Sequence, residues 1–213
     1  MQSRPAPARV RWHSVRMVRD GVAGLVLAAG AGRRMGGPKG LLRRSPAGPT
    51  FVETAVAGLR EAGVDDVHVV VGASAAKVAA LAVQAGGVVV EATGWDEGMG
   101  ASVRAGLEAL ELTDARAALV MLVDLPDVRA AVHARVLAAA HEAGGDLAGV
   151  LVRAAYDGRP GHPVLLGREH WAAIRQEAVG DRGARGLLDG PETRLVECGD
   201  LATGLDVDRP TDL

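Results

Sequence analysis

The sequence predicts an α/β fold of three layers, with a mostly parallel central sheet covered by helices on both faces. Apolar runs alternate with helical patterns along the chain, which is the rhythm of β-α-β units. The strand runs consist of Val, Leu and Ala without polar alternation, as expected when both faces of a sheet are buried. The chain has 213 residues, 48% of them hydrophobic, so it can fill one core and fits one domain better than two.

The expected elements follow one another from residue 23. We expect strands over residues 23–29, 67–71, 88–90 and 117–123, and helices over residues 50–62, 75–85, 99–112 and 128–143. The first helix is bounded at both ends, because Thr50 and Glu53 form a capping box and Gly63 stands where a helix ends. A strand near 147–153, and a turn at 156–161 leading into 163–166, predict a β-excursion late in the chain.

The first twenty residues differ from the rest. They carry five arginines and one acid without helical or strand period, so we expect an extension outside the fold rather than a nucleic-acid arm. Met17 stands directly before the first strand and is an alternative start. A single domain then covers residues 21–213.

Composition excludes several classes of partner. Lys plus Arg total 24 against 26 for Asp plus Glu, so the chain lacks the basic excess that nucleic acid or an anionic membrane attracts. Aromatic residues make up 2%, too few for a platform that stacks single-stranded nucleic acid. One cysteine excludes an internal disulfide, and with no apolar run near the length of a membrane span the expected compartment is the cytoplasm.

A glycine-rich loop follows the first strand. Residues 27–42 read LAAGAGRRMGGPKGLL, and loops of this kind let backbone N–H groups converge on phosphate. Between positions 21 and 52 there are five basic residues and no acid. Lys39 is one of only two lysines beside 22 arginines, which favours a position that requires a compact ammonium group.

A Walker A loop, a dinucleotide-binding loop and a plain tight turn are three interpretations of this loop. A Walker A loop needs Ser or Thr after Gly-Lys, but Lys39 follows Pro38 and precedes Gly40. The spacing of Gly30, Gly32 and Gly36 is a loose relative of the dinucleotide fingerprint, but the second strand ends in Val-Gly with no acid to hold a ribose. A plain tight turn with surface arginines remains the structural alternative.

The loop resembles the nucleotidyltransferase motif LAAGxGxRMGxPK, and most closely that of the molybdenum cofactor cytidylyltransferases within the MobA-like NTP transferases. The resemblance implies a Rossmann-like nucleotidyltransferase fold whose loop wraps an NTP triphosphate. It also implies that Arg33 contacts the departing phosphates and that Lys39 neutralises charge at the α-phosphate. The nucleotide-binding residues implied here are Leu27, Ala28, Ala29, Gly30, Gly32, Arg33, Gly36 and Lys39. Gly40 departs from the family, which usually carries leucine or glutamine there.

Acidic residues supply the expected metal site. Asp124 ends an apolar strand in LVDLP, and Asp127 is the better N-cap for the next helix, so Asp124 has no capping role. The resemblance assigns Asp124 to Mg²⁺ and makes it the third catalytic residue beside Arg33 and Lys39. It also makes the terminal pair Asp206 and Asp208 the second metal contact. We expect these two to point to opposite sides of an extended segment, so that only one, with Asp208 favoured, faces the site.

The segment 94–107, GWDEGMGASVRAGL, is a glycine-rich entry into a helix. In the family this region borders the nucleobase and ribose, which makes Gly98, Met99 and Ser102 nucleotide-binding candidates. Ser102 has helix capping as an equal alternative, and Trp95 is expected to serve packing.

Two later segments are family-like and point to the second substrate. His162 lies between Gly161 and Pro163 in the GHP segment, where a hydrogen-bonded structural histidine is the alternative. Arg182 and Arg185 are expected to bind an anionic acceptor or to pair locally at helical spacing.

These segments occur in the order found in the family, and the resemblance implies a Mg²⁺-dependent nucleotidyltransferase. The resemblance implies that CMP is transferred from CTP to molybdopterin carrying its metal, with release of pyrophosphate and transient contact with a molybdoenzyme. Residues 27–30 read LAAG, and guanylyl-transferring relatives tend to have a second glycine within these four positions. Ala29 therefore favours CTP over GTP. A sugar phosphate or another phosphorylated metabolite as acceptor, or a catalytically silent NTP-binding module, are the alternatives.

Overall fold

The computed structural model describes residues 21–180 and 183–213. The expected N-terminal extension, with Met17, lies outside these ranges. In the described part, seven strands form one sheet in the order β3-β2-β1-β4-β6-β5-β7. They are β1 (Val22–Leu27), β2 (Val67–Val71), β3 (Val88–Glu91), β4 (Ala117–Leu122), β5 (Leu151–Tyr156), β6 (Arg159–Gly167) and β7 (Arg194–Glu197). Only β6 runs antiparallel to its neighbours in this sheet, so the predicted mostly parallel α/β fold is confirmed.

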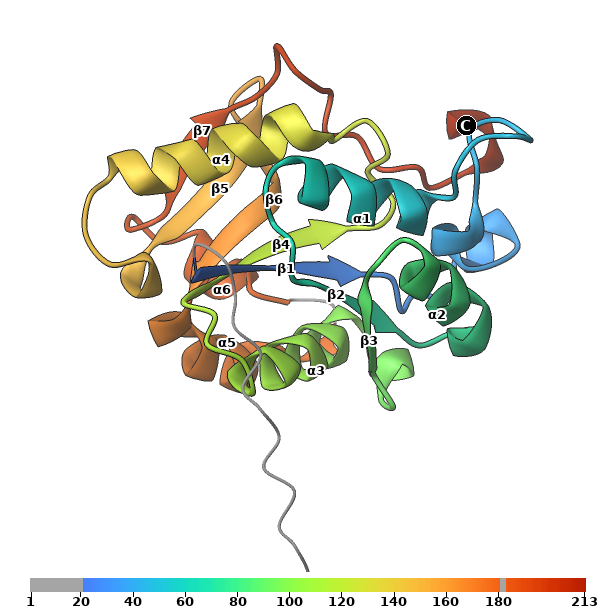
Figure 1. Ribbon diagram of the computed structural model, residues 1–213, viewed down its shortest axis with the longest axis horizontal. Helices are drawn as coiled ribbons and strands as arrows, with labels where there is room; N and C mark the ends of the chain where they lie inside the picture. The colour runs from blue at the N-terminus through green and yellow to red at the C-terminus, as the bar shows by residue number, and fades with distance from the viewer. Residues whose placement is uncertain (1–20, 181–182) are drawn as a thin grey trace, which may run out of the picture.

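Helices cover both faces of the sheet (Figure 1). One face carries α1 (Phe51–Glu61), α2 (Ala75–Gln84) and α4 (Ala130–Glu142), and the other carries α3 (Met99–Glu111), α5 (Trp171–Glu177) and α6 (Arg185–Leu188). Neighbouring residues of the central strands enter opposite cores. Val26 and Met121 pack toward α1 and α4, whereas Leu25 and Val120 pack toward α3. This two-sided burial explains why the strand sequences are apolar without alternation.

The ends of α1 follow local chemistry. The Thr50 hydroxyl accepts a hydrogen bond from the Glu53 N–H, and the Glu53 carboxylate accepts one from the Thr50 N–H at 2.7 Å. Gly63 follows the C-cap with φ of +91°, the left-handed conformation that glycine adopts at low cost. The predicted capping box and helix end are both confirmed.

The predicted cap of α4 is wrong. The helix begins at Ala130, two residues later than expected, and Asp127 does not cap it. The Asp127 carboxylate instead accepts hydrogen bonds from the N–H and the hydroxyl of Thr203, at 2.8 and 2.5 Å. A long-range contact therefore takes the carboxylate that local spacing assigned to the helix.

The β-excursion also differs in its boundaries. Residues 147–149 form a 3-10 turn capped by Asp146, so the strand expected near 147–153 starts only at Leu151. It turns into β6 through Asp157 and Gly158, which have φ of +50° and +74°. An Asp-Gly pair with positive φ at both positions is typical of a two-residue hairpin, and this hairpin makes β6 antiparallel.

The carboxyl ends of β1 and β4 form the edge of the sheet at which we expect a ligand to bind. Strands β1 and β4 are parallel neighbours, and their carboxyl ends carry the glycine loop and Asp124. The Val207 N–H donates to the Asp124 carbonyl at 2.9 Å, so the C-terminal segment returns to the same edge. Ligands of open α/β sheets bind at such a switch point. No helix in the described ranges has both the length and the apolar character needed to cross a membrane.

Candidate active site

The glycine loop after β1 folds back on itself. Gly32 has φ of +57°, and its carbonyl accepts hydrogen bonds from Met35 N–H at 2.8 Å and Gly37 N–H at 3.2 Å. A Cβ at this position would lie 2.0 Å from the Gly37 carbonyl oxygen, so only glycine fits there. A second short turn at Lys39–Leu41 then carries the lysine at its first position.

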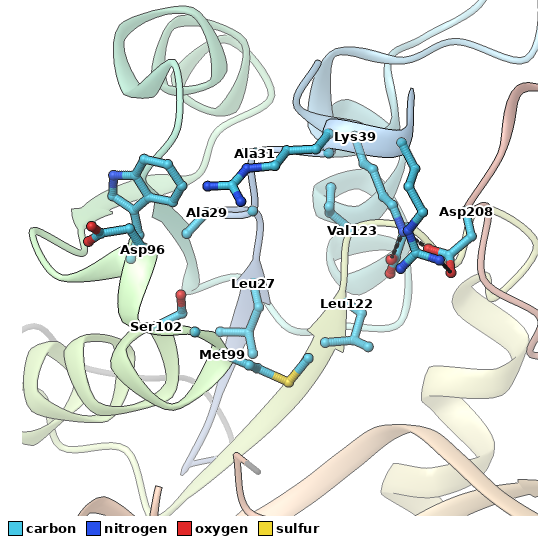
Figure 2. A pocket seen from close by; sticks show the side chains of 17 residues that line it. Leu27, Ala29, Ala31, Lys39, Asp96, Met99, Ser102, Leu122, Val123 and Asp208 are labelled. Atoms are coloured by element: carbon cyan, nitrogen blue, oxygen red, sulfur yellow. Dashed lines mark hydrogen bonds and ion pairs between the residues drawn. The ribbon is translucent and has the colours of Figure 1, made fainter. Parts of the chain in front are cut away.

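A cavity of about 480 Å³ opens at this edge of the sheet (Figure 2). Cavities of this size accommodate small-molecule ligands and cofactors. Figure 2 shows Lys39 and Asp208 at one end of it, with Asp96, Met99 and Ser102 on the opposite side. The lining residues are Leu27, Ala29, Gly30, Ala31, Gly32, Arg33, Arg34, Lys39, Trp95, Asp96, Gly98, Met99, Ser102, Leu122, Val123, Asp124 and Asp208.

Lys39 connects three distant parts of the chain. Its ammonium group donates hydrogen bonds to Asp124 at 2.7 Å and to Asp208 at 2.5 Å. Arg34 donates a further hydrogen bond to Asp208 at 3.0 Å. The Lys39 and Asp124 side chains are 17% and 18% exposed, so water screens their ion pair less than a pair on the surface.

These contacts shift the pKa values of the groups. Burial alone would lower the pKa of Lys39, but the hydrogen bonds and the attraction of Asp124 and Asp208 outweigh it and raise that pKa above its usual value. The Lys39 hydrogen bond, with the positive charges of Lys39 and Arg34, lowers the pKa of Asp208. Lys39 is therefore charged at neutral pH, and so is Asp208.

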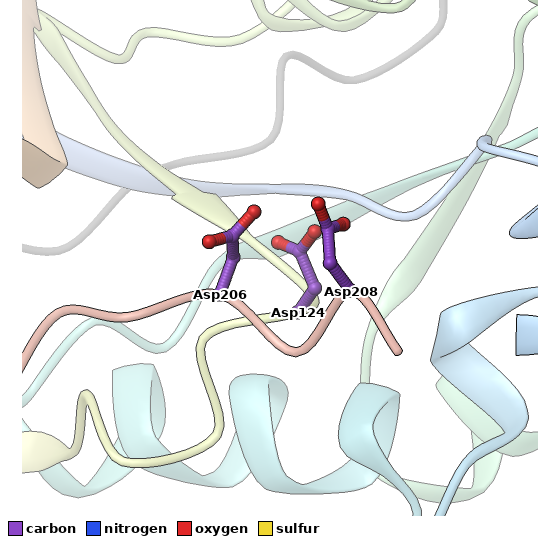
Figure 3. A group of neighbouring side chains, drawn as sticks. All are labelled: Asp124, Asp206 and Asp208. Atoms are coloured by element: carbon purple, nitrogen blue, oxygen red, sulfur yellow. The ribbon is translucent and has the colours of Figure 1, made fainter. Parts of the chain in front are cut away.

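The three acidic residues expected at the metal site lie together (Figure 3). Asp124, Asp206 and Asp208 each offer a carboxylate oxygen, and these oxygens lie within 4.8 Å of one another. The expectation that only one of Asp206 and Asp208 faces the site is wrong. Residues two apart in an extended segment lie on the same side, and Val207 between them is buried in the core on the other side.

The donor set fits a hard divalent cation. Ligands of Mg²⁺ lie about 2.1 Å from the ion, so neighbouring ligand oxygens are roughly 3 to 4 Å apart, close to the spacing of this cluster. One oxygen of Asp124, Oδ1, is buried and has no hydrogen-bond partner among the described residues. A buried carboxylate oxygen without a donor is an open coordination position.

Most of the remaining nucleotide-binding candidates also lie at the cavity. Leu27, Ala29, Gly98, Met99 and Ser102 all line it, as the nucleotide-binding expectation requires. Ser102 is not a helix cap, because α3 begins at Met99 with Gly98 as its N-cap. Of the expected nucleotide-binding residues, Ala28 and Gly36 are the two that do not line the cavity.

Of the expected acceptor residues, His162 and Arg185 belong to the described part of the chain, and neither lines the cavity. His162 lies on β6, the antiparallel neighbour of β4, two residues before Val164, which pairs with Val120. Burial and the nearby charge of Arg153 lower the pKa of His162 to about 4, so the imidazole is neutral at pH 7. Arg185 begins α6, and Arg182 lies outside the described residues.

Arg34 and Trp95 are among the cavity residues whose place in the site sequence reasoning missed. Arg34 was counted only as part of the basic loop, and its ion pair with Asp208 spans 174 positions that no local pattern connects. Trp95, expected to serve packing, is half-buried and lines the cavity as well as touching the core. Aromatic residues make up only 2% of the chain, so a tryptophan in the glycine-rich segment 94–107 could have been recognised as a candidate from the sequence.

Comparisons with known proteins agree with this arrangement. The pattern of the MobA-like NTP transferase domain matches residues 24–197. Among curated proteins, the nicotine blue oxidoreductase of Paenarthrobacter nicotinovorans is 36% identical over 197 residues, covering 88% of this chain and 92% of the relative.

Solved structures share the fold. Rv0371c from Mycobacterium tuberculosis H37Rv is 27% identical with a TM-score of 0.72, covering 90% of this chain and 94% of that one. The same protein has been solved in complex with manganese, with a TM-score of 0.68. A nucleotidyl transferase from Methanothermobacter has a TM-score of 0.74 at 23% identity, over 91% of this chain and 94% of its own.

Proposed function

The chain belongs to the MobA-like NTP transferase family, a family of nucleotidyltransferases, and we propose that it transfers CMP from CTP to molybdopterin carrying its metal. In this proposal Mg²⁺ is the resident divalent cation, pyrophosphate is released and a cytosine dinucleotide form of the cofactor is the product. The proposed compartment is the cytoplasm, where a molybdoenzyme would receive the product through transient contact.

The observation that carries the proposal is the position of Lys39. One ammonium group lies between Asp124 and Asp208, at the mouth of a glycine loop and on the wall of a ligand-sized cavity. Paired carboxylates beside a basic, glycine-rich turn are what binding of a metal–triphosphate complex requires. The structure of Rv0371c in complex with manganese supports a divalent cation as part of this proposal.

The residues of the chain then have separate tasks in the transfer. A phosphate oxygen of the acceptor attacks the α-phosphorus of CTP, the bond from that phosphorus to the bridging oxygen breaks, and pyrophosphate leaves. Arg33 lies on the cavity wall, where it binds the departing phosphates, and Lys39 neutralises the charge that develops around the α-phosphorus. Asp124, Asp206 and Asp208 hold the divalent ion, which neutralises phosphate oxygens when it is bound.

The acceptor side rests on fewer contacts. His162, Arg182 and Arg185 are proposed to bind the anionic acceptor, and the position of His162 on β6, the neighbour of β4, supports its part in this. A sugar phosphate or another phosphorylated metabolite would suit the same transfer chemistry. A silent NTP-binding module is the weaker alternative, because a chain without catalysis would not need both the carboxylate cluster and Lys39.

The name of the Paenarthrobacter relative favours a second candidate, an oxidoreductase built on the same fold. The chain after β2 argues against a dinucleotide cofactor, since Val71 is followed by Gly72, Ala73 and Ser74 without an acid to hold a ribose. Thermal stabilisation separates the two candidates. The transferase is stabilised by Mg²⁺·CTP, and an oxidoreductase would be stabilised by NADH or NADPH instead.

A two-part experiment tests the proposed function. The four Mg²⁺·NTPs are first compared by the rise in melting temperature, where CTP is expected to give the largest shift and GTP a smaller one. Pyrophosphate release is then followed with the preferred NTP and a set of acceptors that includes molybdopterin, a sugar phosphate and no acceptor. Release that requires molybdopterin supports the proposal, and release with another acceptor only would replace the substrate while keeping the reaction.

A further inference from the structure

We propose that the indole of Trp95 is the platform on which the nucleobase of the NTP stacks. This inference rests on the proposed function, because it assumes that an NTP occupies the cavity. It assigns to Trp95 the binding of the base and leaves the triphosphate to the glycine loop, Lys39 and the carboxylates.

Trp95 is singled out among the aromatic residues of the chain by its exposure. Phe51, Tyr156 and Trp171 are 2%, 6% and 1% exposed. The Tyr156 hydroxyl donates a hydrogen bond to the His162 carbonyl, and the Trp171 indole N–H donates one to the Leu166 carbonyl. Within residues 21–180 and 183–213, Trp95 alone offers a partly exposed aromatic ring, and that ring is on the cavity wall.

The back of the side chain is supported by a close contact with the end of β2. A Cβ added to Gly72 would lie 2.5 Å from Cβ and Cγ of Trp95, and 2.9 Å from Cβ of Ala29. Glycine at position 72 therefore lets the tryptophan lie directly against the backbone. A ring supported from behind in this way is preorganised, so stacking costs little side-chain entropy.

The loop that carries Trp95 is fixed to α3. Trp95 donates its backbone N–H to Ala92, and its carbonyl accepts from Gly98 at 3.3 Å. Two residues further on, Glu97 accepts a hydrogen bond from Arg104 of α3 at 3.1 Å. The position of the ring is thus set by the same helix whose first turn supplies Met99 and Ser102.

Trp95 directly precedes Asp96, which lies with Met99 and Ser102 on the side of the cavity opposite Lys39 and Asp208 (Figure 2). The cations Lys39 and Arg34 lie with Asp124 and Asp208 at the first end. A nucleotide fits this arrangement with its phosphates toward the two cations and the flat apolar face of its base toward Trp95. Stacking is tolerant of base identity, so Trp95 contributes affinity for any NTP, and discrimination falls to neighbours such as Ala29 and Ser102.

The experiment compares a ligand that has a base with one that has none. Mg²⁺·CTP and Mg²⁺·tripolyphosphate are titrated by calorimetry into the wild-type chain and into Trp95→Leu and Trp95→Phe variants. We expect Trp95→Leu to weaken CTP binding by about 5- to 100-fold and to leave tripolyphosphate binding unchanged. Trp95→Phe retains a ring and is expected to retain most of the affinity. CTP should also quench the tryptophan fluorescence of the wild-type chain but not that of Trp95→Phe.

Each other outcome overturns the inference in a recognisable way. Unchanged CTP affinity in Trp95→Leu removes the stacking role. An equal loss for CTP and tripolyphosphate shows that Trp95 supports the fold of the site rather than the base. If the wild-type chain binds tripolyphosphate but not CTP, the base-stacking inference is wrong while triphosphate binding stands. If it binds neither ligand, the proposed function itself is wrong.

Discussion

The ammonium group of Lys39 lies 2.7 Å from a carboxylate oxygen of Asp124, although 85 residues separate the two in sequence. The same group contacts Asp208 from the end of the chain. Without nucleotide, Lys39 therefore compensates the negative charge of the carboxylates that we assign to the metal. We expect that binding of a metal–triphosphate complex exchanges these contacts of the ammonium group for contacts with phosphate oxygens.

Replacement of Lys39 by alanine should lower turnover more than it weakens NTP binding. The charge around the α-phosphorus redistributes in the transition state, whereas several backbone amides of the loop share the ground-state binding. We expect kcat to fall by roughly 10² to 10³ with little change in KM, measured by steady-state pyrophosphate release. A raised KM at unchanged kcat would assign Lys39 to binding alone.

Replacement of Lys39 by methionine should increase the affinity for a metal ion in the absence of nucleotide. The variant keeps most of the side-chain volume but removes the cation that neutralises Asp124 and Asp208. Titration with Mn²⁺ followed by electron paramagnetic resonance should show binding tighter by about tenfold, or ~1.4 kcal/mol. Lys77→Met, at an exposed position on α2, is the matched control and should behave like wild type. Equal or weaker Mn²⁺ binding in Lys39→Met would contradict the exchange.

Asparagine at position 208 should be more damaging than asparagine at position 206. Both carboxylates face the cluster, but Asp208 also accepts hydrogen bonds from Lys39 and Arg34, whereas Asp206 is exposed. We expect Asp208→Asn to reduce activity by roughly 10² or more and Asp206→Asn by about tenfold at saturating Mg²⁺. The reverse order of severity, measured across a Mg²⁺ titration, would assign the principal metal contact to Asp206.

Local patterns predicted the fold and one half of the site. The apolar strands, the capping box at Thr50 and the glycine loop follow from short-range chemistry, and Asp124 followed from the end of a strand. The failures concern residues whose partners are distant in sequence. Asp127 binds Thr203 instead of capping α4, and no local pattern places Asp208 beside Arg34. The error at Asp206 was one of geometry, since alternation places it on the same side as Asp208.

The buried histidine of α4 should make stability pH-dependent. His133 is fully buried, and this burial lowers its pKa below the usual value of about 6.5. In the unfolded chain the imidazole takes up a proton as the pH falls through about 6.5, whereas in the folded chain it does so only at lower pH. The contribution of His133 to the free energy of unfolding is therefore fully present above about pH 6.5. Below that pH it decreases by up to ~1.4 kcal/mol per pH unit.

Urea unfolding between pH 7.5 and about 5 measures this effect. His162, with its pKa lowered to about 4, contributes a slope of the same sign over this range. A His133→Leu variant should therefore show a smaller slope than the wild-type chain, with the contribution of His162 retained. Identical slopes in the variant and the wild-type chain would show that His133 takes up its proton equally in both states.

The most direct test of the central claim follows the α-phosphorus itself. The full chain is incubated with Mg²⁺, molybdopterin carrying its metal, and CTP labelled at the α-phosphorus, with an Asp124→Asn variant as the matched control. We predict that the label moves to the molybdopterin product in proportion to the pyrophosphate released, and that the folded Asp124→Asn variant transfers none. Label that stays in CTP when wild-type protein is incubated with molybdopterin, and with each alternative acceptor in its place, would contradict nucleotidyl transfer as the activity of this chain.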